Sequence, residues 1–306
     1  MFKRNRNHIQ IIQQLKAISY SMKIVQFLGG LGNQMFQYAL YKALQREFSN
    51  VKADLHGYQN YSLHNGFELE NVFNIKLKTI NPFTRNIYIK HNRKWVYRKL
   101  RRILNVKNAY QEEKSLFAFD PSILTDPKPR YYWGYWQNLQ YFERIADELR
   151  SDFNFKKKLT GTNQQTLAQI NQSQSIAIHV RRGDYLKDPL LGGLCGVDYY
   201  QAAIELIQMK VASPKFFIFS DDIAWCKEHL GLTNAAFITW NTGQKSYIDM
   251  QLMSACKHNI IANSSFSWWA AWLNPNQSKI VVYPKKWVND HQTEESMATP
   301  ETWIAL

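Results

Sequence analysis

Short apolar runs alternate along the chain with longer segments in which apolar side chains recur every three or four residues. The short runs are rich in β-branched and aromatic residues and are bounded by turn residues, which is typical of buried strands. The longer segments 34–48 and 198–211 have the spacing of helices that bury one face, and Asp198 is expected to cap the second. The expected strands are Lys23–Leu28, Ser175–Val180, Phe216–Ser220, Ala236–Trp240, Asn259–Ala262 and Lys279–Tyr283.

The order of these segments predicts how the chain is organised. From residue 175 onward strands and helices alternate, which indicates an α/β fold with a parallel sheet covered by helices. The first strand and the glycine-rich turn after it indicate a similar start to the N-terminal half. A polar stretch between residues 151 and 174 predicts a domain boundary. We therefore expect a basic N-terminal extension over 1–21, an N-terminal domain over 22–155, a linker over 156–174 and a C-terminal domain over 175–306.

Composition narrows the class of protein. The chain has 306 residues, a hydrophobic fraction of 45% and a charged fraction of 20%, as in globular proteins. Its three cysteines, Cys195, Cys226 and Cys256, are widely spaced, which argues against a disulfide framework and a structural zinc site and favours a cytoplasmic location. No apolar run has the length of a membrane-spanning helix, and the first 21 residues are too polar for a signal peptide.

The turn Gly29-Gly-Leu-Gly-Asn-Gln34 follows a strand and opens a helix. It matches the dinucleotide-binding fingerprint only in part, because the third glycine falls on Met35, whose side chain would obstruct helix–strand packing. The backbone N–H groups of such a turn can face an anion or a polar ligand, and Asn33 and Gln34 can add amide contacts. A plain strand-to-helix turn remains the alternative.

Charged residues follow two of the expected strands. In His179-Val-Arg-Arg-Gly-Asp-Tyr185, the guanidinium groups of Arg181 and Arg182 suit the two phosphates of a nucleotide diphosphate. The alternative is that they pair with acidic neighbours such as Asp184 or Asp188. In Phe219-Ser-Asp-Asp222, a carboxylate can accept from base or ribose groups, or can cap the next helix.

No Asp-x-Asp occurs in the chain, which weakens the case for a divalent metal bridging a diphosphate. After the strand that ends at Ala262, Ser264 and Ser265 precede a helix pattern, where hydroxyl and backbone N–H groups can cradle a phosphate. Serine at this position can equally be only a helix cap. The tryptophans Trp268, Trp269 and Trp272 of that helix are expected in the core.

Two further segments have an unusual composition. Aromatic residues, 14% of the chain, are densest in Tyr131–Asn138, where they suit the apolar face of a sugar ring or a buried corner. The segment Lys90–Lys107 carries eight Lys and Arg and no acid, within a chain of net charge +14. A basic amphipathic helix of this kind can lie on an anionic membrane or bind polyanions, and a solvated face is the alternative.

Five of these segments, taken together and in order, resemble the α-1,2-fucosyltransferases of glycosyltransferase family 11, and specifically the bacterial-type galactoside enzymes. The resemblance covers nearly the whole chain from Met22 onward. It departs from the family pattern in the basic extension and at Ala270, where a glycine is frequent. The segments are Gly29–Tyr38, Gly134–Gln137, His179–Tyr185, Phe219–Asp222 and Asn263–Trp269.

The resemblance implies a GT-B fold, in which two Rossmann-like domains face a cleft. It also implies inverting, metal-independent transfer of L-fucose from GDP-β-L-fucose to the 2-hydroxyl of a terminal galactose, without a cofactor. The first half would bind the galactose-terminated acceptor and the second half GDP-fucose. The residues and the resemblance together assign the catalytic site to Arg181, Arg182, His179 and Asp184, donor binding to Gly32, Asn33, Asp221, Asp222, Asn263, Ser264, Ser265 and Phe266, and acceptor binding to Tyr135, Trp136 and Gln137.

Several alternatives stay open at this point. His179 and Asp184 are both candidates for the base, and a loose transition state can also release its proton to water. A transferase with another donor or linkage would carry similar phosphate-binding motifs. A basic polyanion-binding protein would explain the net charge, although no nucleic-acid motif accompanies that charge. Peripheral contact with an anionic membrane is the expectation that the basic segment favours.

Overall fold

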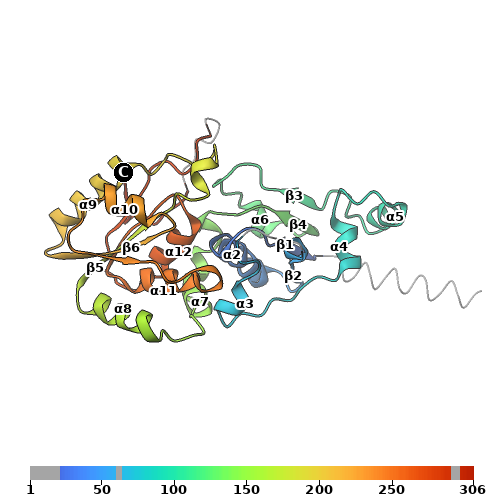
Figure 1. Ribbon diagram of the computed structural model, residues 1–306. Helices are drawn as coiled ribbons and strands as arrows, with labels where there is room; N and C mark the ends of the chain where they lie inside the picture. Colours follow the sequence, from blue (N-terminus) through green and yellow to red (C-terminus); the bar gives the residue numbers. More distant parts are fainter. Residues whose placement is uncertain (1–20, 60–63, 291–296) are drawn as a thin grey trace, which may run out of the picture. The chain divides into compact units, whose positions relative to one another are not determined.

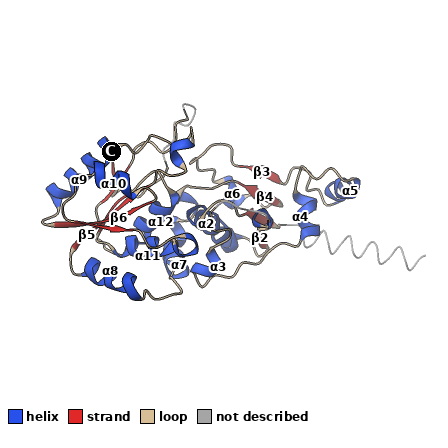
Figure 2. Cartoon of the chain, in the orientation of Figure 1, coloured by secondary structure: helices blue, strands red, loops and turns tan. Residues whose placement is uncertain are grey.

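The computed structural model describes residues 21–59, 64–290 and 297–306. The chain forms two compact units, which meet in sequence between Leu149 and Arg150; Gly30–Gly32 and Asn71–Asn74 group with the second unit. Each unit contains its own parallel sheet and the helices packed around it (Figures 1 and 2). The expected α/β class, with two Rossmann-like domains, is confirmed.

The sheet of unit 1 has the strand order β2-β1-β4-β3, and all neighbouring strands are parallel. Aliphatic and aromatic side chains of β1 and β4 pack against apolar side chains from the segments before and after α5. This hydrophobic core of unit 1 lies beside the two central strands. Helices α2, α3 and α7 each include residues of both units. The elements are β1 (Lys23–Gln26), α2 (Leu31–Glu47), β2 (Val51–Asp54), η1 (His56–Tyr58), α3 (Leu69–Val72), α4 (Pro82–Tyr88), α5 (Trp95–Ile103), β3 (Tyr110–Glu112), α6 (Ser122–Thr125), β4 (Arg130–Trp133), η2 (Leu139–Tyr141), η3 (Glu143–Ile145) and α7 (Ala146–Asp152).

The sheet of unit 2 has the order β10-β9-β8-β5-β6-β7 and is also parallel throughout. Its central strand β5 is buried on both faces, as a parallel strand between two layers of helices must be. The elements are α8 (Gly161–Asn171), β5 (Gln174–Val180), η4 (Tyr185–Lys187), α9 (Val197–Lys210), β6 (Pro214–Ser220), α10 (Ile223–His229), β7 (Ala235–Ile238), η5 (Gly243–Lys245), α11 (Tyr247–Ala255), β8 (His258–Ile260), α12 (Ser265–Leu273), β9 (Val281–Tyr283) and β10 (Ile304–Ala305).

All six expected strands are present, with ends that shift by a few residues. Helix α2 begins at Leu31, directly after the glycine turn. The expected cap at Asp198 is wrong: α9 begins one residue earlier, the extended Gly196 takes the cap position, and Asp198 lies within the first turn. There its charge still faces the positive end of the helix. The polar stretch before residue 175 contains helix α8.

The tryptophans of α12 lie in the core of unit 2, as expected. Trp268 and Trp269 are fully buried and Trp272 is nearly so. The Trp268 ring stacks on Trp272 and meets Trp269 edge to face, with centroids 6.4 and 5.0 Å away. These three rings therefore pack against one another on the buried side of α12.

The basic extension expected over residues 1–21 lies outside the described residues, apart from Ser21. Among the helices that are described, none combines the length and the apolar character that a membrane span requires.

Candidate functional site

The charged and polar motifs of unit 2 meet at one edge of its sheet. Strand β5 lies between β6 and β8, and all three are parallel, so the loops after Val180, Ser220 and Ile260 leave the sheet on the same side. Ligands of open α/β sheets bind at this edge. The structure thereby brings together the arginine, aspartate and serine motifs that are far apart in the sequence.

Arg181 is held by two carboxylates. Its Nη2 donates to Asp184 at 2.8 Å, and its Nη1 lies 3.2 Å from an oxygen of Asp221. The side chain is 31% exposed. Burial lowers the pKa of Arg181, but the hydrogen bond that Arg181 donates to Asp184 and the charge of Asp221 outweigh it and raise the pKa overall. Arg181 is therefore a fixed cation, and its other N–H groups can serve a ligand.

Arg182 is oriented in a different way. Its Nε donates to Asp222 at 3.2 Å, and its guanidinium carbon lies 4.2 Å from the centre of the Trp225 ring. The backbone N–H of Arg182 donates to Asp221 at 2.8 Å. Asp222 also caps α10, accepting from the N–H of Trp225, so this aspartate has the capping role that the sequence offered. Of the two acidic neighbours proposed for the arginine pair, Asp184 is a partner of Arg181, whereas Asp188 instead accepts from backbone N–H groups of its own loop.

His179 is enclosed behind this pair. It is 7% exposed, its ring lies 5.9 Å from Phe266, and its Nδ1 has no hydrogen-bond partner among the described residues. Burial and the nearby charge of Arg181 lower the pKa of His179 to about 4. His179 is therefore neutral at physiological pH, and its small exposed fraction limits direct access of a substrate.

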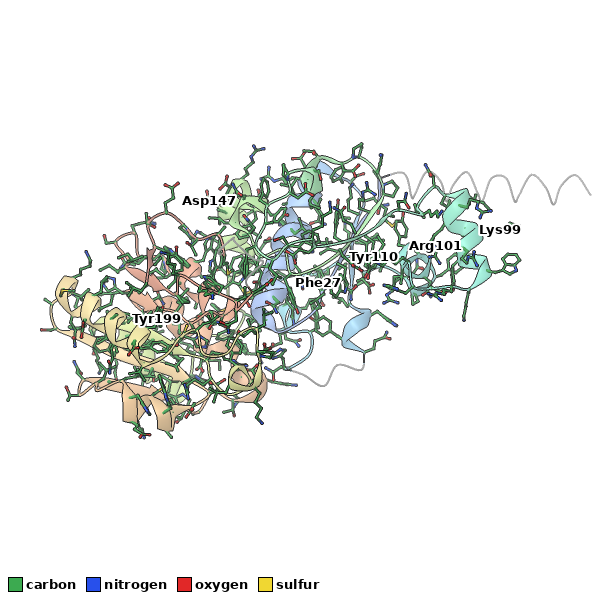
Figure 3. All side chains as sticks on the ribbon, turned by 90° about the horizontal axis from the view of Figure 1, so that it is seen from above. Phe27, Lys99, Arg101, Tyr110, Asp147 and Tyr199 are labelled. Carbon is green, nitrogen blue, oxygen red and sulfur yellow. The ribbon has the colours of Figure 1, made fainter. Side chains whose placement is uncertain are left out.

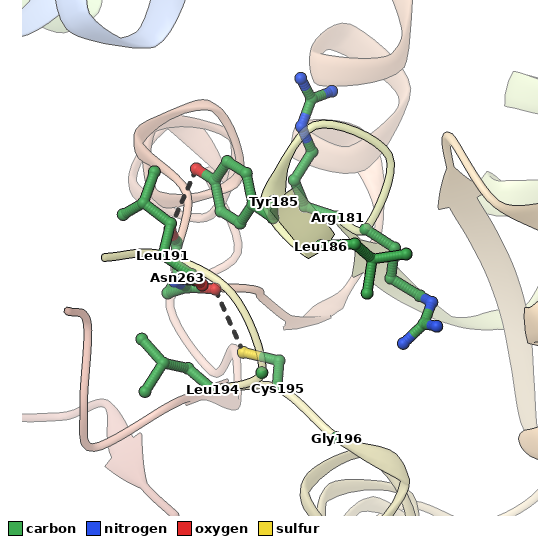
Figure 4. A pocket seen from close by; sticks show the side chains of 10 residues that line it. Arg181, Tyr185, Leu186, Leu191, Leu194, Cys195, Gly196 and Asn263 are labelled. Atoms are coloured by element: carbon green, nitrogen blue, oxygen red, sulfur yellow. Dashed lines mark hydrogen bonds between the residues drawn. The ribbon is translucent and has the colours of Figure 1, made fainter. Parts of the chain in front are cut away.

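A pocket opens between the Arg181–Gly196 loop and the end of β8 (Figure 4). Asn263 organises its wall: its carbonyl oxygen accepts from the Tyr185 hydroxyl at 3.3 Å and its side-chain oxygen from the Cys195 thiol at 3.5 Å. The Asn263 amide donates to the backbone oxygens of Leu191 and Trp287. Asn263 is only 4% exposed, and both its side-chain oxygen and its side-chain nitrogen form hydrogen bonds within the protein. Asn263 therefore supports the wall of the pocket.

Helix α12 begins beside this pocket. Ser264 occupies the cap position, but its side chain makes no capping hydrogen bond, so the hydroxyl does not satisfy the N–H groups of the first turn. Gly32 packs tightly against that turn: a Cβ on Gly32 would lie 2.5 Å from the backbone nitrogen of Phe266 and 2.7 Å from the Ser265 hydroxyl oxygen. Glycine is required here to let the two backbones approach.

The remaining predicted site residues lie in unit 1. Gln137 donates to the Asn33 side chain at 2.7 Å, so these two amides fix one another. Trp136 is 2% exposed and packs edge to face on Tyr132, which places its ring in a buried corner. Tyr135 is half-buried. Gln137 and Tyr135 are thus the more accessible members of the predicted acceptor segment.

Glu113 is a residue that the sequence analysis missed. Its two carboxylate oxygens accept from the backbone N–H groups of Tyr135 and Trp136, at 2.8 and 3.0 Å. This contact holds Trp136 in a left-handed backbone conformation with φ of 58°. Burial raises the pKa of Glu113 to about 7 although both hydrogen bonds oppose the shift. No local pattern marks Glu113, because its partners are more than twenty residues away.

The pocket wall also contains residues that were not predicted, namely Tyr185, Leu191 and Cys195. The sequence does carry a signal for these residues, because a long loop with paired glycines follows the central strand at its ligand-binding end. Burial raises the pKa of the Cys195 thiol to about 12, so burial favours the protonated thiol over the reactive thiolate. Among the described residues, no three His, Cys, Asp or Glu side chains are grouped as metal ligands.

Several known proteins are similar to this chain in sequence or in structure. Residues 3–306 match the family described as "Glycosyl transferase family 11". An "Alpha-1,2-colitosyltransferase" of Escherichia coli is 32% identical over 94% of this chain and 99% of that protein. A "Galactoside alpha-(1,2)-fucosyltransferase 1" of Bos taurus is 27% identical over 80% of this chain and 64% of the bovine protein. Among solved structures, the fucosyltransferase NodZ from Bradyrhizobium has a TM-score of 0.48, with 13% identity over 82% of this chain and 92% of that one.

Proposed function

The chain belongs to glycosyltransferase family 11, and on that premise we propose that it is an inverting, metal-independent galactoside α-1,2-fucosyltransferase. The donor is GDP-β-L-fucose and the acceptor is the 2-hydroxyl of a terminal galactose in a glycan. The observation that carries the proposal is the pair Arg181 and Arg182, oriented by three aspartates at the ligand-binding edge of unit 2. The names of the relatives, which include fucosyl- and colitosyltransferases, support this class of donor.

In the proposed reaction, negative charge develops on the leaving group. The bond from the anomeric carbon of fucose to the β-phosphate oxygen breaks, a bond to the galactose O2 forms on the opposite face, and the O2 proton leaves. GDP departs with its negative charge increased by one, and a fixed cation stabilises that charge where it develops. Arg181 has this role, because its guanidinium is permanently charged and already held in place before the donor binds.

Arg182 and the start of α12 complete the phosphate site. Arg182 stacks on Trp225 and pairs with Asp222, which leaves its two terminal NH2 groups for a phosphate. The first turn of α12 offers backbone N–H groups and the positive end of the helix dipole. Two guanidinium groups can neutralise a diphosphate without a divalent cation, which supports metal independence.

The proton of the galactose hydroxyl has no dedicated acceptor in this proposal. Asp184 is engaged with Arg181, so its role is to position that guanidinium. The His179 ring is neutral, but it is buried. Release of the proton to water late in a loose transition state requires neither residue.

A specific observation favours a second donor. The Escherichia coli relative that is 32% identical carries the name of an α-1,2-colitosyltransferase. A nucleotide-activated colitose is therefore the alternative donor, and it would use the same phosphate site. The two donors are to be compared directly.

The test is product analysis by mass spectrometry after the purified protein is incubated with GDP-fucose and lactose, with and without EDTA. Addition of one deoxyhexose in the presence of EDTA is the expected result, and NMR of the product establishes the linkage. Loss of the product with EDTA would reject metal independence. No transfer from GDP-fucose, together with no binding of GDP-fucose by calorimetry, would reject the donor.

The same proposal includes a cytoplasmic location. All three cysteines are unpaired, which supports a reducing compartment. Fractionation of cells that express the full chain tests this placement.

A further inference from the structure

One end of unit 1 presents apolar side chains to solvent. Helices α4 and α5 are neighbours there (Figure 1). The ring of Phe83 on α4 contacts the ring of Tyr97 on α5. Trp95 is 68% exposed, Phe83 50% and Val96 44%. Large apolar side chains normally avoid water, so three of them on adjacent helices indicate a surface that is covered in use.

Helix α5 places cations on the same face as Trp95. Arg98, Lys99 and Arg102 follow Trp95 by three, four and seven residues, which is the spacing of one helix face. All three are exposed, and the Lys99 ammonium lies 5.4 Å from the centre of the Trp95 ring. We call Phe83, Trp95, Val96, Arg98, Lys99 and Arg102 the α5 surface.

The opposite face of α5 fixes this orientation. Tyr97 and Leu100 pack on the core of unit 1. Arg101, which is labelled in Figure 3, is buried. Its guanidinium donates to the backbone oxygens of Ile89, Lys90 and Asn92. Because the inner face is anchored by the core and by these carbonyls, the outer face cannot turn Trp95 inward.

The surrounding charge has one sign. Between Glu70 and Glu112 the sequence has eleven Lys and Arg and no acidic residue. In the described part of the chain, Lys90 pairs with Glu112 and Arg85 with Asp54, whereas no carboxylate pairs with Arg98, Lys99 or Arg102. The α5 surface therefore carries a positive charge that no carboxylate of the described residues neutralises.

We propose that the α5 surface docks onto an anionic phospholipid bilayer. Trp95 and Val96 enter the headgroup region, where the amphipathic indole ring of tryptophan is favoured. Arg98, Lys99 and Arg102 reach the lipid phosphates, and their aliphatic stems cover the adjacent apolar area. The inference is independent of the fucosyl transfer reaction, because these residues take no part in the phosphate site.

The combination of side chains favours lipid over nucleic acid. Nucleic-acid surfaces bind through cations that follow a strand, with aromatic rings placed for base stacking. Here aliphatic Val96 shares the exposed tip with Trp95 and Phe83, and it gains free energy only by leaving water. Charge and apolar area together match a bilayer interface.

The test is co-sedimentation of the full chain with vesicles of phosphatidylglycerol and phosphatidylcholine, compared with pure phosphatidylcholine. We expect binding to the anionic vesicles that weakens as salt is raised. Trp95→Ala should weaken it about 10-fold through lost apolar contact. Lys99→Glu should weaken it about 30-fold, since it changes the local charge by two.

The matched control is Met209→Ala/Lys210→Glu, which alters an exposed apolar residue and a cation at the end of α9 in unit 2. It should bind vesicles as the unaltered protein does. Transfer to soluble lactose should be unchanged in all these variants, which separates this inference from the proposed reaction. Equal binding to pure phosphatidylcholine, unaltered binding by Trp95→Ala, or an equal loss in the control would overturn the proposal. Binding of single-stranded RNA that these variants weaken, without binding of vesicles, would also overturn it.

Discussion

Replacement of Arg181 by alanine is the perturbation that bears most directly on the proposed reaction. Its guanidinium is about two thirds buried, so its charge acts in a medium of effective dielectric constant near 20. At a separation of about 4 Å, its attraction for the charge that develops on the leaving phosphate is roughly 4 kcal/mol. At 1.36 kcal/mol for each factor of ten, that is a loss of about a thousandfold in rate.

The local carboxylates add to this loss. Without Arg181, Asp184 and Asp221 keep their charge but lose their cation, and they then repel the diphosphate. Arg181→Lys keeps the charge and loses the planar fork, so it should retain more activity than Arg181→Ala while remaining at least about tenfold below the unaltered protein. Lys187→Ala is the matched control, because Lys187 is an exposed cation of the same loop, and it should be nearly neutral.

Single-turnover kinetics measure this effect without interference from product release. We expect the rate constant to fall more than the affinity for GDP-fucose, since the interaction strengthens as charge develops. The thermal unfolding midpoint should change little, as Arg181 lies at the surface edge of the sheet. A rate constant for Arg181→Ala within tenfold of the unaltered value, in a folded protein, would refute the reasoning. An equal loss in Lys187→Ala would do so as well.

Three other changes test particular contacts. Gly32→Ala should lower GDP affinity at least about tenfold, because its Cβ would displace the first turn of α12, whereas Gly57→Ala, with only ordinary contacts, should not. Burial raises the pKa of Glu113 from 4.5 to about 7, so the free energy of unfolding should fall as the pH rises from 4.5 to 7 and the buried carboxyl ionises. Glu113→Gln cannot ionise, so denaturant titrations of this variant should show a pH-dependent fall that is smaller by up to about 3 kcal/mol. Trp268→Ala should cost about 3–5 kcal/mol of unfolding free energy, and the partly exposed Trp240→Ala should cost less than about 1 kcal/mol by calorimetry.

The strands of unit 2 could be predicted because each is a continuous apolar run between turn residues, and that pattern belongs to strands buried on both faces. Trp268, Trp269 and Trp272 were assigned to the core by helical spacing alone, and they are buried there. The position of Arg181 and Arg182 at the end of β5 followed from the same local pattern. The start of α9 was missed, since its cap residue Gly196 gives no side-chain signal, and helix α8 was missed within the polar stretch that was expected to be a linker.

The partners of these residues were decided by the tertiary structure. Arg182 pairs with Asp222, forty residues further along the chain, and Glu113 holds the backbone of Tyr135 and Trp136. The sequence by itself determined the family, the strands and the residue types at the ligand-binding edge, because local periodicity and motif order carry that information. It did not determine that the Trp136 ring is buried while the Trp95 ring is exposed, because burial depends on which distant segments pack against a side chain.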